Sequence, residues 1–348
     1  YVISAAKSII PYVKDDNMVV LESTSPVGTT EKIGEILKNG GVDISKIYIA
    51  HCPERVLPGK ILKELTQNDR IVGGTTKIAT KKIAEFYAEF VEGEVLQTDS
   101  KTAEMSKLTE NSFRDVNIAF ANELSILCDK FGINVWELIS LANRHPRVNI
   151  LNPGCGVGGH CIAVDPWFIV HAGGYEARLI KSAREVNNHK AEWSIEKIKN
   201  AALKFELQNG KKPKVACMGL AFKPDIDDLR ESPALNITKC LIADGVDVLA
   251  VEPNIKAHKD FEIADYKKAI EISDIIVFLV GHKEFKGLKI EKEVLDFCGI
   301  FRCHRGSCRL PCRVPQGSSV VLIGAGTRRR GATSNGIARH PSGAERDG

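Results

Sequence analysis

Short apolar runs alternate with helix-like repeats over the first hundred residues of the chain. Runs of strand length lie at residues 18–21, 47–50 and 70–73, and polar or glycine-containing sequence follows each of them. Residues 76–91 repeat their apolar positions at helical spacing and lead to another apolar start at Val95. Alternating strands and helices are typical of a doubly wound α/β sheet. The pattern therefore predicts an α/β domain over residues 1–98.

A long helical repeat without glycine or proline then runs from residue 103 to residue 131. Gly132 follows at the position where helices commonly end, and Asn134 is a suitable N-cap for a helix that reaches about Asn143. A loop rich in proline and glycine and a further helical stretch come next, at residues 145–166 and 177–207. These elements predict a central, all-helical domain over residues 99–208.

After a polar linker, strands and helices alternate again. The strand-like runs are residues 214–218, 248–251 and 275–280. Ser232 followed by Pro233 is a strong helix start, and Gly245 ends that helix. Residues 209–302 are therefore predicted to form a second α/β domain. The predicted fold class is α/β, with two Rossmann-like doubly wound domains joined by the central helical one.

The last segment, residues 303–348, differs from the rest of the chain. It holds eight arginines and no lysine, and its hydrophobic periodicity disappears, so we interpret it as a disordered or out-of-frame tail. An apolar run ending in Gly-Ala-Gly at residues 320–326 resembles a Rossmann first strand, but a poor helix start follows it. A zinc module is disfavoured because no second ligand pair accompanies Cys303, His304, Cys308 and Cys312.

Composition mainly excludes other classes of protein. The net charge of +4 is too small to argue for nucleic-acid binding, and no apolar run approaches the roughly 20 residues of a membrane helix. Ten cysteines are scattered along the chain without a close CxxC pair, which favours reduced thiols and a cytoplasmic location.

A glycine-rich loop around Cys161 carries the strongest chemical signal. Its glycines at positions 154, 156 and 159 form a formal GxGxxG. We reject a dinucleotide-binding turn, because Asn-Pro precedes the glycines and Asp165-Pro166 follows closely enough to oppose a helix start. A thiol beside bare backbone, with a carboxylate four residues on, suits a covalent nucleophile. A buried cysteine packed near a turn is the alternative on spacing alone.

Polar side chains at helical spacing precede this loop. Lys107, Asn111 and Arg114 share one face of the predicted central helix. His145 and Arg147 supply further donors on the way to the glycines, and phosphates need such donors. The stripe on the helix suits an anion-binding cleft, although a solvated helix face has the same spacing.

Two cations follow the first strand of the C-terminal α/β domain. Lys223 and Arg230 flank an acidic stretch there. Ligands of doubly wound sheets bind at the C-terminal ends of strands, so this pair suits a pyrophosphate. Ordinary surface charge is the other interpretation.

Five motifs in this order together resemble the UDP-glucose/GDP-mannose dehydrogenase family. They are ESTSPVGT at residues 22–29, PERVLPG at 53–59, Lys107-xxx-Asn111, GGHCIAVDP at 158–166 and GLAFKPDIDDLRESP at 219–233. The segments at residues 110–117 and 143–150 are similar to the branch of the family that acts on UDP-N-acetyl-D-mannosamine. The resemblance covers the chain from Tyr1 to about residue 302.

The resemblance implies the remainder of an NAD-binding domain at residues 1–98, a central domain that forms a homodimer and a C-terminal UDP-sugar domain. It implies a four-electron oxidation, with NAD as cofactor, in cell-surface polysaccharide biosynthesis. Cys161 would form a thiohemiacetal and then a thioester, Lys107 would act as general acid/base, and Asn111 and Asp165 would position water and the oxyanion. Glu54 is also expected at the catalytic centre. No metal, nucleic acid or membrane is expected as a partner.

The resemblance also implies contacts with substrate and cofactor. The expected substrate contacts are Arg55, Val56, Lys107, Asn111, Arg114, His145, Arg147, Gly158, Phe222, Lys223, Arg230 and Arg302. The expected contacts with NAD are Thr24 and Arg230.

Two alternatives stay open. The substrate could be another nucleotide sugar (UDP-glucose, UDP-N-acetylglucosamine or GDP-mannose), or the chain could be an inactive fragment that only binds nucleotide sugar. The chain starts at Tyr1 inside an amphipathic pattern, and the glycine-rich first βαβ unit of the family has no counterpart in it. We therefore expect a missing N-terminal segment and weak NAD binding, because that turn places the pyrophosphate at a helix N-terminus.

Overall fold

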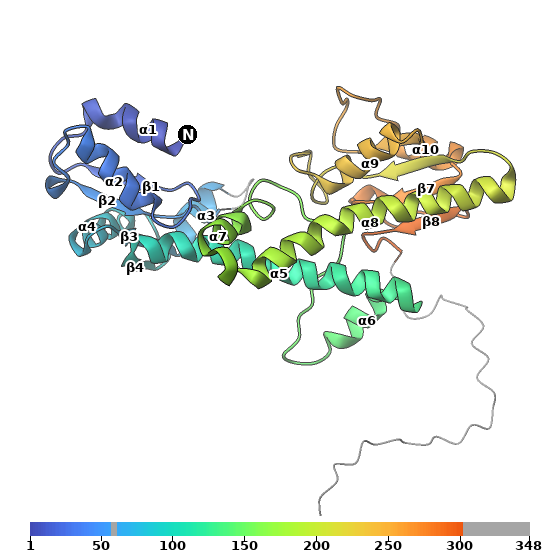
Figure 1. Cartoon of the computed structure of the whole chain (residues 1–348), viewed down its shortest axis with the longest axis horizontal. Coiled ribbons are helices and arrows are strands. Elements are labelled where there is room, and N and C mark those ends of the chain that lie inside the picture. The colour runs from blue at the N-terminus through green and yellow to red at the C-terminus, as the bar shows by residue number, and fades with distance from the viewer. Residues whose placement is uncertain (57–60, 302–348) are drawn as a thin grey trace, which may run out of the picture. The chain divides into compact units, whose positions relative to one another are not determined.

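The computed structural model describes residues 1–56 and 61–301 (Figure 1). The described chain contains an N-terminal sheet, a layer of long helices and a C-terminal sheet. The expected substrate contact Arg302, the tail at residues 303–348 and the disfavoured zinc module lie outside the described residues. None of the described helices is both long enough and apolar enough to cross a membrane.

The N-terminal sheet has the strand order β1-β2-β3-β4. Its strands are β1 (Met18–Leu21), β2 (Tyr48–His51), β3 (Arg70–Gly74) and β4 (Val95–Asp99). The outer pairs β1–β2 and β3–β4 are parallel, as strand–helix alternation predicts. The central pair β2–β3 is antiparallel, with Ala50 opposite Gly74. Sequence alternation cannot reveal this reversal, because the connection through a short helix does not specify a crossover.

Helices cover both faces of this sheet. They are α1 (Val2–Ile9), α2 (Thr29–Asn39) and α4 (Lys77–Ala88). The short helix α3 (Ile61–Gln67) lies between β2 and β3 in the chain, and 3-10 turns lie at Ile10–Tyr12 and Ile44–Lys46. Ile49 packs with α1 and α2, whereas its neighbour Ala50 packs with Ile83 of α4. Adjacent strand residues point to opposite faces, so the alternation in β2 places these helices on either side.

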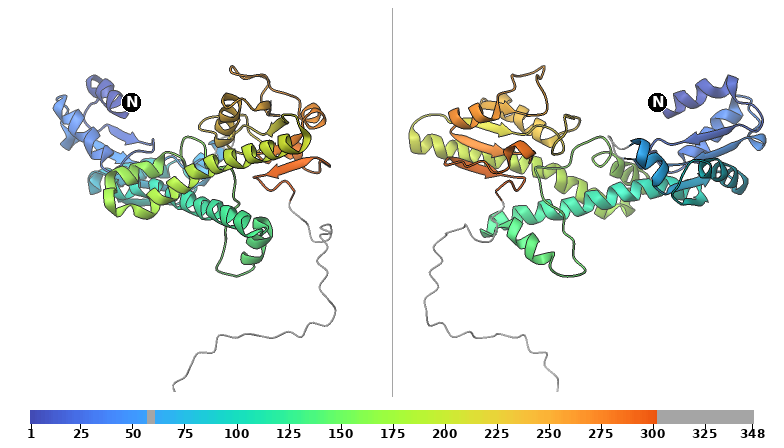
Figure 2. Two further views of the ribbon diagram at one scale, coloured as in Figure 1. Left: turned by 45° about the vertical axis from the view of Figure 1, so that its right-hand side comes forward. Right: turned by 180° about the vertical axis from the view of Figure 1, so that it is seen from behind.

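The helical layer begins directly after β4. It consists of α5 (Ser100–Phe131), α6 (Val135–Ala142), α7 (Asp165–Gly173), a 3-10 turn (Gly174–Glu176) and α8 (Arg178–Asn209). The predicted helix ends are confirmed at Gly132, which has φ 67°, and at Asn134, whose side chain accepts the N–H groups of Trp136 and Glu137. Helices α5 and α8 lie side by side (Figures 1 and 2).

The expectation that Asp165-Pro166 opposes a helix start is wrong, because α7 begins at Asp165. Proline is favoured in the first turn of a helix, where its missing N–H has no partner to lose. The dinucleotide interpretation of the glycines still fails, since the residues before them form helix α6 and a loop and not a strand.

The C-terminal sheet is fully parallel, with the strand order β6-β5-β7-β8. Its elements are β5 (Lys214–Met218), α9 (Pro233–Ala243), β6 (Asp247–Val251), α10 (Tyr266–Ile272), β7 (Ile275–Phe278), a 3-10 turn (Lys283–Phe285) and β8 (Glu293–Asp296). One face packs on Ile198 of α8 and Ile237 of α9, and the other packs on Ala269 of α10. The strand order reverses between β5 and β7, which makes the ends of these strands a ligand-binding position.

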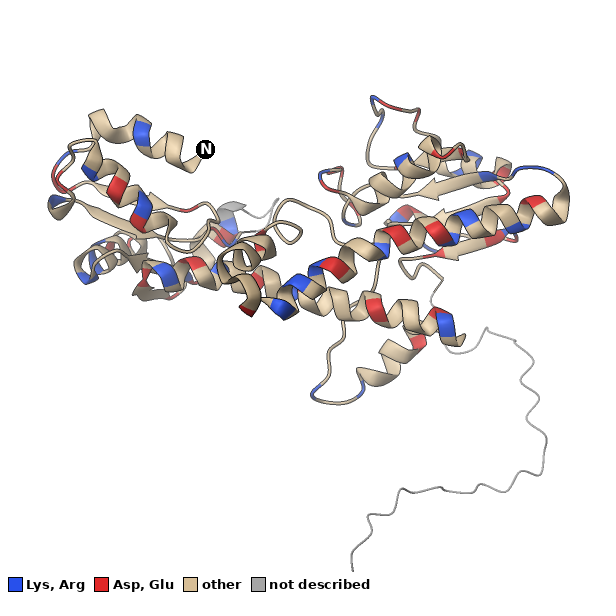
Figure 3. Cartoon of the chain, viewed as in Figure 1, with Lys and Arg blue, Asp and Glu red and all other residues tan. Residues whose placement is uncertain are grey.

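Charge is distributed without a dominant sign along the described elements. Lys and Arg alternate with Asp and Glu along α8, and both signs occur on either sheet (Figure 3).

Candidate active site

Cys161 lies half-buried in the turn that leads into α7. Its carbonyl oxygen accepts the N–H groups of Val164 at 3.0 Å and Asp165 at 2.8 Å, which fixes the turn. Burial and the Asp165 carboxylate raise the pKa of the Cys161 thiol, while the charges of Lys107 and Arg230 oppose this rise. A raised pKa favours the protonated thiol of Cys161 at neutral pH.

The helix α5 brings two of the predicted catalytic side chains to this thiol. Asn111 donates from Nδ2 to Oδ2 of the buried Asp165 at 2.5 Å. Burial raises the pKa of Asp165, and the Asn111 hydrogen bond and the Lys107 charge counteract it. In the described part of the chain, the Lys107 ammonium makes no hydrogen bond or ion pair. The structure thus brings Cys161, Lys107, Asn111 and Asp165 together, and their catalytic roles stay a prediction.

The segment after β2 reaches the same place. Glu54 accepts the backbone N–H of Val56, and its charge makes a smaller contribution to the raised pKa of Cys161. Arg55 forms an ion pair with Glu110 of α5, with 2.9 Å between Nη2 and Oε1. The segment is thereby attached to α5 next to Asn111, which places Glu54 near the thiol and engages the charge of Arg55.

The glycines before Cys161 allow a close approach of the loop after β5. A Cβ on Gly158 would lie 2.6 Å from the carbonyl oxygen of Glu231 and 2.8 Å from Cβ of Phe222, so no side chain fits there. Gly159 has φ +82° and donates its N–H to the carbonyl oxygen of Arg230 at 3.2 Å. The predicted bare backbone therefore serves loop-to-loop packing, and it places Gly158 and Phe222 together beside Cys161.

The two predicted cations in the loop after β5, Lys223 and Arg230, differ in how they are paired. Arg230 is paired with Asp228, with 2.6 Å between Nη2 and Oδ2, so its charge is balanced in the protein without ligands. Lys223 is exposed near the C-terminal end of β5, at the reversal of strand order. A pyrophosphate contact by either residue stays a prediction.

Other predicted contacts are not gathered around Cys161 in one chain. His145 and Arg147 are exposed in a loop that Asn143 closes with two hydrogen bonds to the backbone of Ile150. This loop follows α6, which begins after the far end of α5, and that end of α5 is about 36 Å along the helix from Lys107 at 1.5 Å per residue. Arg114 is exposed one turn beyond Asn111, and Thr24 is half-buried in the loop after β1.

Glu104 is a positioning residue that the sequence reasoning missed. Its fully buried carboxylate accepts the N–H groups of Gly28 at 2.6 Å and Thr30 at 2.7 Å, and the Thr30 hydroxyl at 2.6 Å. It therefore joins the loop after β1, which carries Thr24, to α5 one turn before Lys107. The available signal was its place three residues before Lys107, on the same helical face.

A buried polar network that supports the glycine loop was also missed. Arg184 of α8 pairs with Asp115 of α5 at 2.7 Å, and Asn187 donates to the same carboxylate at 2.8 Å. Asn122 donates to Asn187 at 2.9 Å and accepts the backbone N–H of Gly154 at 2.9 Å. Two long helices are thereby connected to the loop that carries Cys161.

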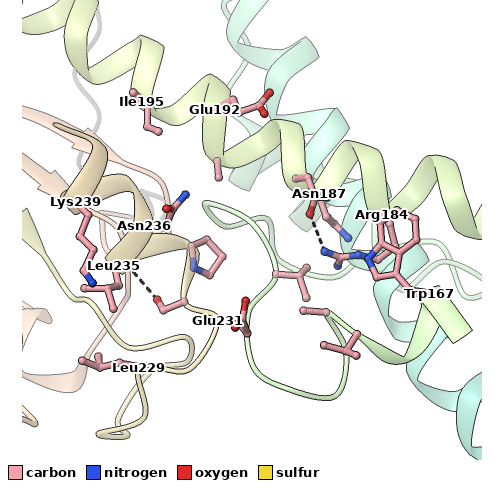
Figure 4. A pocket seen from close by; sticks show the side chains of 17 residues that line it. Trp167, Arg184, Asn187, Glu192, Ile195, Leu229, Glu231, Leu235, Asn236 and Lys239 are labelled. Carbon is pink, nitrogen blue, oxygen red and sulfur yellow. Dashed lines mark hydrogen bonds between the residues drawn. The ribbon is translucent and has the colours of Figure 1, made fainter. Parts of the chain in front are cut away.

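This network borders a cavity of about 660 Å³. Arg184, Asn187 and Trp167 lie at one side of it, and Asn236 and Lys239 of α9 lie at the other (Figure 4). Chain neighbours of Cys161 and Arg230, such as Ala163 and Glu231, line this cavity, whereas the side chains of Cys161 and Arg230 do not. We therefore locate the chemistry by the contacts of Cys161 and not by this cavity.

A third missed feature stabilises the turn that carries Phe222. Glu252 is buried at the end of β6, and its carboxylate accepts hydrogen bonds from the N–H groups of Leu220 at 2.7 Å and Ala221 at 2.9 Å. The same carboxylate lies 2.9 Å from Nε2 of His282. These hydrogen bonds lower the pKa of Glu252 to about 2 despite its burial.

His282, Asp225 and Glu284 lie close enough together to hold a metal ion. Both ring nitrogens of His282 already have partners, which argues against a metal.

Comparisons with known proteins assign the chain to a family of enzymes. Three models of the UDP-glucose/GDP-mannose dehydrogenase family match in order: the NAD binding domain at residues 1–91, the central domain at 101–189 and the UDP binding domain at 216–299. These matches confirm the resemblance drawn from the five motifs.

Individual relatives agree with the family models. UDP-N-acetyl-D-mannosamine dehydrogenase of Campylobacter jejuni is 53% identical over 315 residues, which cover 86% of this chain and 76% of that protein. NDP-N-acetyl-D-galactosaminuronic acid dehydrogenase of Ralstonia nicotianae is 50% identical over 323 residues, which cover 88% and 75%. The solved UDP-D-ManNAc dehydrogenase of Pyrococcus horikoshii superposes with a TM-score of 0.79 at 37% identity, covering 87% of this chain and 73% of that chain. This likeness confirms the predicted fold class.

Proposed function

The chain belongs to the UDP-glucose/GDP-mannose dehydrogenase family, and on this premise we propose that it oxidises UDP-N-acetyl-D-mannosamine to the uronate through a covalent intermediate on Cys161. Family membership makes it an NAD-dependent nucleotide-sugar dehydrogenase. One observation carries the proposed mechanism: the Cys161 thiol lies beside Lys107 and the Asn111–Asp165 pair. The C. jejuni relative supports the choice of sugar.

The chemistry follows from what a thiol adds to an aldehyde. Oxidation of a CH2OH group to a carboxylate removes two hydrides, which NAD accepts when bound. After the first removal, the sulfur of Cys161 attacks the aldehyde carbon, and the new C–S bond gives a thiohemiacetal. Loss of its C–H as the second hydride gives a thioester. Water then cleaves the C–S bond and returns the thiol with the carboxylate product.

The neighbouring side chains suit the protons and charges of this sequence. Lys107 is the proposed general acid/base, and its ammonium stabilises the oxyanion of each tetrahedral adduct. Asp165 fixes the Asn111 amide through the 2.5 Å hydrogen bond, so that the amide can orient water or the oxyanion. When the Cys161 thiol adds to the aldehyde, its proton passes to the former carbonyl oxygen, which becomes the hydroxyl of the thiohemiacetal, and Lys107 is the proposed relay for this proton.

The remaining predicted contacts fall into a substrate group and a cofactor group. Thr24 and Arg230 are the proposed contacts of NAD. Within the described residues, the proposed contacts of the UDP-sugar are Arg55, Val56, Lys107, Asn111, Arg114, His145, Arg147, Gly158, Phe222, Lys223 and Arg230. We also propose a cytoplasmic location, a role in cell-surface polysaccharide biosynthesis, and the domain division at residues 98, 208 and 302.

The described residues fit NAD only in part. The backbone N–H groups at the start of α2 are the natural place for an anion after β1, but the Glu104 carboxylate occupies them. Thr24 lies in the loop before that helix and is available to a cofactor. Because the Glu104 carboxylate holds these N–H groups, we predict weak NAD binding by this chain, and an isothermal titration that gives micromolar affinity would contradict it.

A homodimer through α5 has support from an exposed apolar stripe. Phe113, Phe120, Leu127 and Phe131 are exposed at intervals of seven, seven and four residues, which places them along one side of the helix. A second copy would cover this stripe. Antiparallel packing about a two-fold axis would bring the 143–150 loop of one copy towards the Lys107 end of the other, which gives His145 and Arg147 a route to the site.

A second candidate substrate follows from the Ralstonia relative. Its name refers to an N-acetylgalactosaminuronic product, and its 50% identity is close to the 53% of the C. jejuni enzyme. The UDP derivative of N-acetylgalactosamine is therefore the leading competitor for the same mechanism.

A substrate panel tests the choice of sugar. The full-length protein is assayed for kcat/KM with UDP-N-acetylmannosamine, UDP-N-acetylgalactosamine, UDP-N-acetylglucosamine, UDP-glucose and GDP-mannose. We expect UDP-N-acetylmannosamine to be preferred by at least about tenfold, or 1.4 kcal/mol of transition-state binding. Preference for another sugar would overturn the assignment of substrate and leave the mechanism intact. No turnover of any of them would favour a fragment that only binds nucleotide sugar.

A further inference from the structure

Among the residues that the structure describes, Lys190 is a buried lysine without a paired acidic side chain, and the proposed oxidation does not use it. It lies in the middle of α8 with 2% of its surface exposed. In the described residues its ammonium makes no hydrogen bond and no ion pair. Its nearest partner is the face of Trp193, 3.6 Å from Nζ to the ring centroid, with the Phe297 ring at 5.8 Å. A buried ammonium with only ring faces around it is costly, so an anion that pairs with it there would be favoured.

The Lys190 side chain borders a cavity of about 340 Å³. Two of the three tryptophans of the chain, Trp136 and Trp193, line it together with Phe297. The other apolar residues that line the cavity are Ile133, Val135, Pro153, Val294 and Leu295. The volume is at the low end of ligand pockets, about 300–1,000 Å³, and suits a single-ring molecule better than a dinucleotide.

The acidic residues around the cavity are already engaged. Asp129 of α5 pairs with Lys197 of α8 at 2.5 Å. Asp296 accepts the backbone N–H groups of residues 298, 299 and 301. The charged and titratable groups that face Lys190 or share its cavity are Cys128, Asp129, Cys155, Lys197 and Asp296. None of them neutralises the Lys190 ammonium within the described structure.

We propose that this cavity is a binding site for a small organic anion with a flat apolar body, such as an aromatic carboxylate. The anion would pair with the Lys190 ammonium at the base of the cavity while its ring packs against Trp193 and Trp136. The site is independent of the oxidation at Cys161, because no residue of the catalytic group lines it. It also joins α5, α6, α8 and the segment after β8, so a ligand there contacts both the helical layer and the C-terminal sheet.

The protonation of Lys190 makes binding at this site depend on pH. Burial lowers the pKa of the Lys190 ammonium to about 7. An anion binds the protonated form, so its apparent affinity is full below pH 7 and falls above it, approaching tenfold per pH unit. This pH profile separates pairing with Lys190 from apolar packing alone, which would not change over the same range.

Tryptophan fluorescence of the full chain tests the site with benzoate as probe and inorganic phosphate as a second anion. We expect saturable quenching by benzoate at pH 6.5 that weakens through pH 8.5, and little response to phosphate. Lys190→Met should abolish the saturable signal. Lys190→Arg should retain it but lose the pH dependence, because guanidinium stays charged. Lys199→Met is the matched control on the same helix, since Lys199 pairs with Asp244 away from the cavity.

Three results would overturn the proposal. One is no saturable quenching by benzoate up to about 10 mM, which is weaker than specific sites bind. Another is equal quenching in the folded Lys190→Met variant. The third is a benzoate affinity that is unchanged between pH 6.5 and 8.5. Saturable binding of phosphate alone would overturn the apolar part of the proposal, because it would show an ion site without ring recognition.

Discussion

Charges of opposite sign around Cys161 shift the pKa of its thiol in opposite directions. Burial and Asp165 favour the protonated form, whereas Lys107 and Arg230 favour the thiolate. A nucleophile held protonated until substrate arrives is protected against adventitious oxidation, since the thiolate is the reactive form. Asp165, whose charge raises the pKa of the thiol, also accepts the hydrogen bond that orients Asn111.

We predict that Asp165→Asn makes Cys161 more reactive towards iodoacetamide at pH 7.5. Removing a negative charge lowers the pKa of the thiol, and each unit is a factor of about ten in thiolate, so we expect roughly three- to tenfold faster alkylation. Mass spectrometry of the peptide containing Cys161 gives the rate. Asp260→Asn, in a remote exposed pair with Lys239, should leave the rate unchanged. An unaltered rate in folded Asp165→Asn would mean that Asp165 does not control the thiol.

Local spacing predicted part of the site and tertiary contact decided the rest. Lys107 and Asn111 could be placed together from the sequence because one helical turn separates them. Glu104 could not be assigned its role, because its partners Gly28 and Thr30 are more than 70 residues away in the sequence. The glycine pattern predicts bare backbone close to a ligand, which stays a prediction; the structure shows that the close partner of Gly158 is the loop carrying Phe222.

At the scale of elements, the position of the loop carrying Cys161 depends on contacts with the two long helices α5 and α8. Asn122 of α5 and Asn187 of α8 form a buried hydrogen bond, and Asn122 also holds the N–H of Gly154. A small shift of this loop would displace the thiol from Lys107. Precise catalytic geometry therefore depends on residues that never touch the substrate.

We predict that Asn122→Ala lowers kcat by roughly tenfold or more while KM for the sugar changes little, because misplacement by about 1 Å can cost up to a hundredfold in rate. The same change should cost about 1–3 kcal/mol in unfolding free energy, since it leaves buried polar partners unsatisfied. Steady-state kinetics and urea unfolding measure the two effects. Asn209→Ala is the matched control, because Asn209 is exposed at the end of α8 and donates to the carbonyl oxygen of Phe205, outside this network. Loss of stability with unchanged kcat would assign Asn122 a structural role only.

Helix ends were predictable because their signals are local. Gly132, Asn134 and Ser232 end or cap helices at the expected positions. The antiparallel pairing of β2 with β3 and the start of α7 at Asp165 were not foreseen, since both are decided by packing. Strand pairing depends on partners distant in sequence, and a proline at a helix start is favourable or disruptive according to where the helix begins.

For the whole molecule, the exposed stripe on α5 predicts a dimer that a single substitution can weaken. Phe120 lies at the middle of the stripe and is 55% exposed in the single chain. Phe120→Glu would place a charge on each side of a two-fold interface, so we expect a monomer at micromolar concentration where the unaltered chain is dimeric. Light scattering after size exclusion gives the mass. Tyr12→Glu is the control, because Tyr12 is also exposed but lies outside the helical layer. A monomeric unaltered chain would contradict the prediction.

The central claim is a four-electron oxidation through sulfur, and its most direct test is the count of NADH per sugar. Limiting UDP-N-acetylmannosamine is exhausted by the full-length protein with excess NAD, beside Cys161→Ala and a control, Cys240→Ala, whose thiol is half-buried on α9. The account predicts two NADH per sugar in the unaltered protein and in Cys240→Ala, and no completed four-electron oxidation in Cys161→Ala. One NADH per sugar, unaffected by the loss of Cys161, would contradict it.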